Sequence, residues 1–75
     1  MAGNLIRFDS ENYGTAYVRP EDIRILGDRQ DGHTTIGVLM ASGHTLDFTV
    51  KGEIDEVAAD LERCAPGLFD IIRLN

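Results

Sequence analysis

Residues 34–61 constrain the fold of this chain most, because within them a spacing of two between apolar residues changes to a helical spacing. Two runs carry an apolar side chain at every second position, namely Ile36, Val38 and Met40 in the first and Leu46, Phe48 and Val50 in the second. Such alternation is typical of strands with one buried and one solvated face. We therefore predict two neighbouring strands that are followed directly by a helix.

The length of the turn between these strands decides which side chains share a face. A two-residue turn would set Val38 opposite Asp47 and divide the apolar residues between both faces of the sheet. A three-residue turn over residues 41–43 sets Val38 opposite Leu46 and keeps the apolar residues together. Turns of this kind need a residue with positive φ near their end, and Gly43 stands there. We predict the three-residue turn, with Gly43 left-handed.

Residues 53–64 predict a single helix of about three turns. Its apolar positions fall one turn apart and are Ile54, Val57, Ala58, Leu61 and Ala65. This narrow stripe is expected to lie against the apolar face of the sheet. Gly52 is an acceptable N-cap, and Pro66 and Gly67 end the run.

The remaining segments add strands to this unit. Three further extended segments are expected, at residues 5–8, 15–19 and 23–26, with a turn or one turn of 3₁₀ helix at Pro20. In the third segment, Ile23 and Ile25 are expected to face the core. We predict an α+β fold in which an antiparallel β-meander of four to five strands carries one C-terminal helix, at about 53–64, on one face.

The C-terminal residues 69–74 fit a period of two imperfectly, because Phe69 and Ile71 share one side with Arg73. A last strand is predicted there, and a short helix or an unpaired tail remains open. An apolar strand needs an edge to pair with. Pairing within the molecule is the preferred prediction, and the alternative is pairing with a second molecule, which would give a homodimer instead of a monomer.

The 75 residues predict a single small domain, 1–75. Thirteen acidic residues against seven basic ones give a formal charge of −6. This charge repels phosphate groups, so it argues against nucleic acid and anionic membranes and favours a larger protein with a basic surface as partner. A single cysteine, without an apolar run long enough for a signal peptide or membrane span, favours a cytoplasmic protein.

Residues that bind metals or act in catalysis are few. His33, His44 and Cys64 are the only histidine and cysteine residues. The predicted hairpin places the two histidines at opposite ends, so we predict no metal site, no cofactor and no catalytic group. Cys64 is expected to be a small half-buried side chain on the last helical turn. Asp47 is expected on the solvated strand face, and Gly37 where another side chain or another chain approaches the sheet.

The predicted helix carries an acidic face. Its acidic residues are Glu53, Asp55, Glu56, Asp60 and Glu62, and Arg63 is its only cation. Glu56 and Asp60 are four residues apart, so their like charges disfavour the helix slightly. An ordinary solvated face and a surface that docks on a basic partner both explain this pattern. In the second interpretation Glu56 and Asp60, with the apolar Phe69 and Ile72, are the candidate partner-binding residues.

Three segments carry a resemblance to known families. They are residues 17–23 with their Pro20-Glu21-Asp22 turn, residues 35–43 ending in Ser42-Gly43, and residues 50–57 beginning Val50-Lys51-Gly52-Glu53. Together they resemble the short bacterial flagellar and swarming motility regulators of the FlbD-like type. They are also similar, through Phe69, to the LytTR-type DNA-binding domains of response regulators. Both resemblances imply a small sheet with a helix and a regulatory role.

The DNA contacts of the LytTR type are not carried over to this sequence, since Phe69 is followed by Asp70 and apolar residues, and Arg73 is the only cation there. We therefore expect a small non-enzymatic cytoplasmic protein of bacteria or bacteriophage that acts through protein contacts as a regulator. A nucleic-acid-binding transcriptional regulator is the alternative, opposed by the acidic charge. A small enzyme is the second alternative, opposed by the lack of a catalytic constellation.

Overall fold

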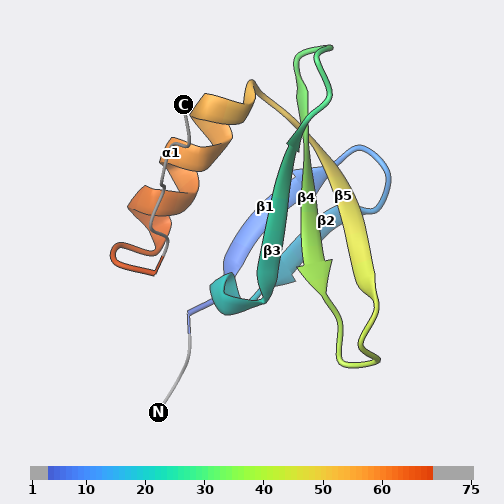
Figure 1. Ribbon diagram of the computed structural model, residues 1–75, viewed down its shortest axis with the longest axis vertical. Helices are drawn as coiled ribbons and strands as arrows, with labels where there is room; N and C mark the ends of the chain where they lie inside the picture. Colours follow the sequence, from blue (N-terminus) through green and yellow to red (C-terminus); the bar gives the residue numbers. More distant parts are fainter. Residues whose placement is uncertain (1–3, 69–75) are drawn as a thin grey trace.

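A computed structural model describes residues 4–68 and shows one antiparallel sheet with a helix against one side of it (Figure 1). In chain order the elements are the strands β1 (Ile6–Ser10) and β2 (Gly14–Val18), the 3₁₀ helix η1 (Pro20–Asp22), the strands β3 (Ile23–Asp28), β4 (His33–Leu39) and β5 (Thr45–Lys51), and the helix α1 (Ile54–Cys64). The predicted α+β class, an antiparallel sheet with one helix packed on it, is confirmed. The strand predicted at 69–74 lies outside the described residues.

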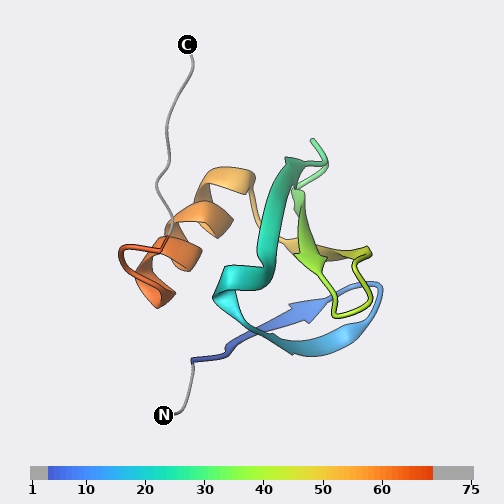
Figure 2. The ribbon, with the colours of Figure 1, turned by 60° about the horizontal axis from the view of Figure 1, so that its bottom comes forward.

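The strand order in the sheet is β2-β1-β5-β4-β3. Strands that follow one another along the chain are therefore neighbours in two groups, β1 with β2, and β3 with β4 and β5. The hairpin joins the other strands through β1, which pairs with β5 by the single bridge of Ser10 and Val50. The two edge strands, β2 and β3, are connected by η1 and do not pair. The predicted β-meander, in which each strand pairs with the next along the chain, is therefore wrong at this connection, because β1 pairs with β5 instead. Figure 2 shows β1 and β2 at a steep angle to β3 and β4, which gives the sheet a strong curl.

The hairpin of β4 and β5 has the predicted register. Ile36 lies opposite Phe48 and Val38 opposite Leu46. The turn is closed by hydrogen bonds from the Met40 amide to the His44 carbonyl at 2.8 Å and from the Gly43 amide to the Met40 carbonyl at 2.9 Å. Gly43 has a φ of 89°, so the predicted left-handed glycine is confirmed.

The core lies between the concave side of the sheet and α1. Among residues 4–68, seven buried apolar side chains form it, namely Ile6, Ile36, Val38, Phe48, Val50, Val57 and Leu61. The helix contributes Val57 and Leu61 from its predicted stripe, and Phe8 packs its ring edge-on against Phe48 at a centroid distance of 5.2 Å. The prediction that the helical stripe meets the apolar face of the β4–β5 hairpin is therefore confirmed.

The side chain of Ile25 does not face the core, so that prediction is wrong. The pairing of β3 with β4 shifts between Ile23 and Ile25, which leaves Arg24 as an extra residue in β3. A bulge of this kind reverses the alternation after it. As a result Ile25 is 60% exposed, and Leu26, opposite Ile36, packs against the core in its place.

The helix begins at Ile54, one residue later than predicted. Glu53, and not Gly52, is the N-cap residue, and the Glu56 carboxylate accepts a hydrogen bond from the Glu53 amide at 3.2 Å. This contact belongs to the capping box that Glu53 and Glu56 form. Gly52 instead donates its amide to the Gly32 carbonyl at 2.9 Å, and its φ of 123° turns the chain from β5 into the helix.

Candidate functional site

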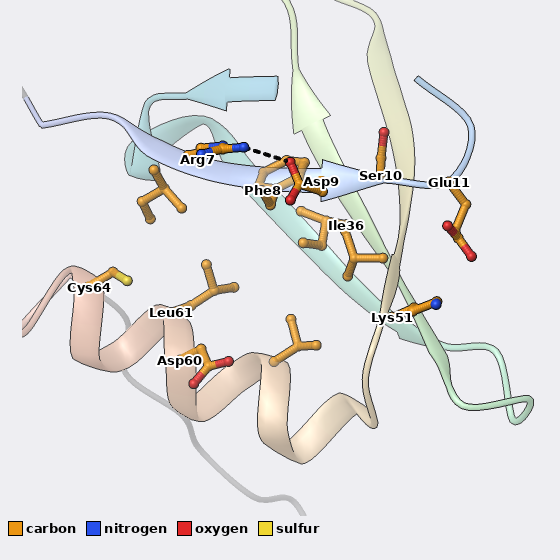
Figure 3. A pocket seen from close by; sticks show the side chains of 13 residues that line it. Arg7, Phe8, Asp9, Ser10, Glu11, Ile36, Lys51, Asp60, Leu61 and Cys64 are labelled. Atoms are coloured by element: carbon orange, nitrogen blue, oxygen red, sulfur yellow. Dashed lines mark hydrogen bonds and ion pairs between the residues drawn. The ribbon is translucent and has the colours of Figure 1, made fainter. Parts of the chain in front are cut away.

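A groove of about 620 Å³ runs between β1 and α1 (Figure 3). Its apolar lining comes from Ile6, Phe8, Ile36, Val50, Val57 and Leu61, and its charged lining from Arg7, Asp9, Glu11, Lys51 and Asp60. Ser10 and Cys64 complete it. The groove exists because β5 ends at Lys51 and the chain turns away into the helix, so the first half of β1 has α1 and not β5 beside it.

The charged side chains of the groove include three carboxylates and two cations. Arg7 and Asp9 approach each other at 3.5 Å on β1, with both side chains more than half exposed, so this pair adds little to stability. Asp60 lies on the opposite wall, on α1, where it pairs with Arg63. The groove therefore combines an apolar floor with a mildly acidic rim.

The four candidate partner-binding residues are only partly brought together. Asp60 lines the groove, whereas Glu56 is exposed but does not line it, since its carboxylate caps the helix. The like charges of Glu56 and Asp60 are thus compensated within the chain, by the Glu53 amide and by Arg63 respectively. Phe69 and Ile72 lie outside the described residues.

Cys64 is exposed, so the prediction of a half-buried cysteine is wrong. It stands on the last turn of α1, at one end of the groove. It also lines a smaller hollow with Asn4, Pro20 and Leu68. The thiol is therefore accessible from solvent at a site where the groove begins.

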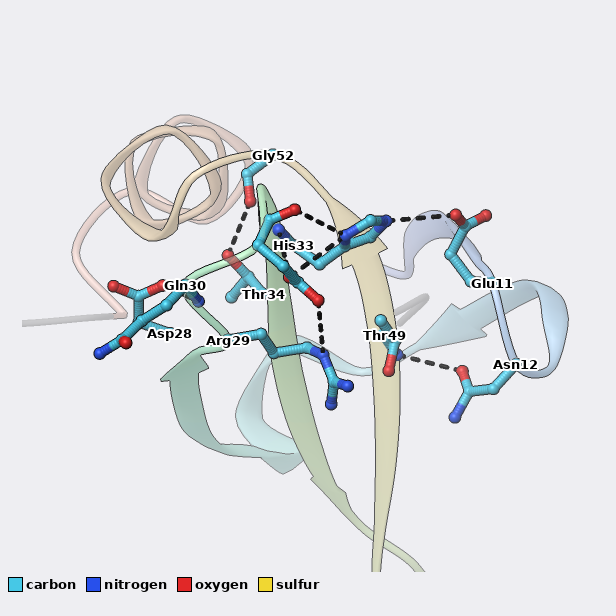
Figure 4. Close-up of polar contacts among 10 residues, drawn as sticks. Glu11, Asn12, Asp28, Arg29, Gln30, His33, Thr34, Thr49 and Gly52 are labelled. Atoms are coloured by element: carbon cyan, nitrogen blue, oxygen red, sulfur yellow. Dashed lines mark hydrogen bonds and ion pairs between the residues drawn. The ribbon is translucent and has the colours of Figure 1, made fainter.

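His33 lies in a polar cluster that ties two loops together (Figure 4). Its Nε2 atom is 3.2 Å from the Glu11 carboxylate, and its Nδ1 atom is 3.3 Å from an Asp31 carboxylate oxygen. The hydrogen bond to Glu11, followed by contacts with Asp31, raises the pKa of His33 above its ordinary value, although desolvation opposes this shift. Carboxylates on both sides favour the imidazolium form, which is the wrong form for a general base near pH 7.

Asn12 continues the contact between the β1–β2 turn and β5 (Figure 4). Its side-chain amide donates to the Asp47 carbonyl at 2.9 Å, and its Oδ1 atom accepts from the Thr49 amide at 3.0 Å. Both groups belong to the backbone of β5. The Asn12 side chain therefore continues the hydrogen bonding between β1 and β5 beyond the single bridge. The spacing of apolar residues in the sequence did not identify this role.

Among residues 4–68, two side chains with hydroxyl groups, Ser10 and Thr34, are buried, and both donate hydrogen bonds to backbone carbonyls. Thr34 donates to the Gly52 carbonyl at 2.9 Å, and Ser10 donates to the Gly14 carbonyl at 2.8 Å. Neither hydroxyl is bonded to a histidine, as an activated nucleophile would be. Within residues 4–68, no three histidine, cysteine, aspartate or glutamate side chains gather as metal ligands would, and His33 and His44 lie at opposite ends of the β4–β5 hairpin.

No protein-family model, no curated protein and no solved structure matches the chain. In the part of the chain that the structure describes, no helix is long and apolar enough to cross a membrane.

Proposed function

We propose that this chain is a small non-enzymatic protein that acts by binding another protein, as a regulator. The observation that carries the proposal is the open groove between β1 and α1, in which an apolar floor lies beneath a charged rim. Sites for protein partners commonly combine a desolvated apolar centre with a polar rim. The resemblance to FlbD-like motility regulators supports the regulatory role, and we propose a cytoplasmic protein of bacteria or bacteriophage.

The charge of the chain indicates the chemistry of the partner. The formal charge is −6, and three of the five charged residues that line the groove are carboxylates. A larger protein with a basic surface and an apolar side chain to insert would match both features. Long-range attraction would steer such a partner to the groove, and apolar burial would hold it there.

The accessible thiol of Cys64 allows a direct test, because it is the only cysteine and stands at the end of the groove. A photo-activatable cross-linker attached to Cys64 is expected to capture one protein in extracts of the source cells. That protein, identified by mass spectrometry and purified, is expected to bind the chain in calorimetric titration. Asp60→Lys is expected to weaken this binding at least about tenfold.

Glu62→Lys provides the matched control, since it makes the same charge change on the same helix at an exposed residue that does not line the groove. Equal loss of binding in both variants would show that net charge, and not the groove, controls recognition. Binding that neither variant changes would refute the groove as the site.

Nucleic-acid binding remains the alternative function, supported by the LytTR-like resemblance and opposed by the negative charge. A gel-shift titration with duplex DNA at low salt and at physiological salt tests it. No shift is expected at either salt concentration. A shift that persists at physiological salt would favour the DNA-binding alternative.

A further inference from the structure

The sheet has two edges, and they differ in how far they are protected against pairing with another strand. β3 carries Arg24 in a bulge on one edge, and both a bulge and a charged residue hinder strand addition. β2 on the other edge is the sequence Gly-Thr-Ala-Tyr-Val, without charge, proline or bulge. Among residues 4–68, β2 pairs with β1 alone. The β2 edge therefore lacks the usual protection.

The backbone of β2 directs hydrogen-bonding groups outward at Thr15 and Tyr17. The Glu11 amide donates to the Thr49 carbonyl of β5 at 2.7 Å, so Glu11 faces β5. Backbone groups of successive residues point to alternate sides of a strand, and the residues of β1 that face β2 are therefore 6, 8 and 10. Their partners are residues 18, 16 and 14. The N–H and C=O groups of Thr15 and Tyr17 consequently point away from β1, to the open side of β2.

We propose that a second copy of this chain pairs with β2 in antiparallel fashion, about a two-fold axis at Ala16. This register sets Thr15 opposite Tyr17 of the second copy and uses the outward N–H and C=O groups of both residues in each copy. The side chains then form an aromatic and β-branched pair, a combination that stabilises sheets. The result is one continuous sheet through the dimer, independent of the groove.

The charges beside β2 are complementary under this two-fold axis. In β1, Arg7 lies opposite Tyr17, and Asp9 lies opposite Thr15 and accepts a hydrogen bond from its hydroxyl at 2.8 Å. Each row of side chains across the dimer therefore holds one Arg7 and one Asp9, from different copies and three strand spacings, about 14 Å, apart. This register thus brings no like charges together. The acidic helix α1 lies away from β2 in both views of the molecule (Figures 1 and 2), so its carboxylates do not crowd the interface.

The proposal is tested by sedimentation equilibrium of the full chain over a concentration series. The wild-type mass is expected to rise from that of a monomer towards twice that value. Tyr17→Lys adds a charge on each side of the interface and is expected to remain monomeric. Ile25→Lys is the matched control, because Ile25 is 60% exposed on the other edge strand and Tyr17 is 64% exposed. It is expected to dimerise as the wild type does. Circular dichroism verifies that both variants are folded.

Amide hydrogen exchange of the same samples locates the contact. The Thr15 and Tyr17 amides are expected to exchange at least about tenfold more slowly in the dimer than in dilute solution. A protein that is monomeric at every concentration would overturn the proposal, as would a dimer lost in Ile25→Lys but not in Tyr17→Lys. Protection of these two amides that does not depend on concentration would show that another part of the same chain covers β2, and would also overturn it.

Discussion

Ile25 covers Gly37 on the outer face of the sheet. A Cβ atom placed on Gly37 would lie 2.7 Å from the Cγ2 atom of Ile25 and 3.2 Å from that of Thr45. The glycine is buried although it belongs to the solvated face, because the side chains of the two neighbouring strands close over it. The expectation that a side chain approaches the sheet at Gly37 is confirmed.

Gly37→Ala is expected to lower the free energy of unfolding by about 1–3 kcal/mol, the usual cost of adding a methyl group to a filled space. The clash involves one methyl group of Ile25, so the same substitution made in an Ile25→Ala background is expected to cost less. Urea unfolding of the four proteins in this cycle measures the coupling. Equal costs in both backgrounds would show that Ile25 does not limit the space above Gly37.

Leu61→Ala tests the packing of α1 on the sheet. Leu61 is 6% exposed in the centre of the core, and truncation of such a side chain costs about 2–5 kcal/mol. The total stability of a domain this small is of similar size, so much of the variant is expected to be unfolded at room temperature. Circular dichroism in a urea titration measures the loss. Glu62→Ala, at the exposed neighbouring position, is the control and is expected to unfold close to the wild type.

The contact of His33 with Glu11 predicts a pH-dependent stability. The raised pKa of His33 in the folded state means that this contact stabilises the fold fully below the unfolded-state pKa of about 6.5. The stabilisation is lost as the pH rises through the higher folded-state pKa. Glu11→Gln is therefore expected to lower the melting temperature more at about pH 5.5 than at about pH 8.5.

Thermal melts of the wild type and Glu11→Gln at several pH values provide this comparison. Glu62→Gln removes an exposed carboxylate from the helix and serves as the control at each pH. A difference between wild type and Glu11→Gln that is constant across the range would show that the contact does not depend on the protonation of His33.

Gly43→Ala tests the left-handed turn residue. No atom outside the adjacent residues lies within 4 Å of a Cβ atom at this position, so only the backbone conformation resists the change. The expected cost is about 1–2 kcal/mol. Chemical denaturation measures it, and Ser42→Ala in the same turn is the control. If alanine costs no more at position 43 than at position 42, the positive φ is not needed to form the turn.

Local spacing was sufficient to predict the parts of the fold that depend on neighbouring residues. The β4–β5 register followed from the apolar residues at every second position of both strands, such as Val38 and Leu46, and from one glycine. The helix followed from Val57 and Leu61, which are about one turn apart. The bulge at Arg24 was missed because Ile23 and Ile25 have the spacing of a regular strand. Period-two spacing shows which residues share a face but not where a strand gains an extra residue.

The groove could not be predicted in the same way. It depends on β1 meeting β5 only at its C-terminal end, around Ser10, while the first half of β1 lies beside α1. These segments are far apart in the sequence. Of the two candidate partner-binding residues that the structure describes, Glu56 and Asp60, only Asp60 lines the groove. Arg7 and Lys51 were not identified, because an isolated cation on a short strand resembles any solvated residue.

The bridge between Ser10 and Val50 also determines how the sheet assembles. The hairpins of β1 with β2, β3 with β4 and β4 with β5 each close a short loop, whereas this bridge closes a long one and so costs more chain entropy. We expect the three strands β3, β4 and β5 to form their sheet early, and β1 to dock on β5 in a late step. Substitution of Asn12 by alanine would then speed unfolding more than it slows refolding in stopped-flow measurements. The seam between β1 and β5 is therefore the place where we expect the native protein to open first.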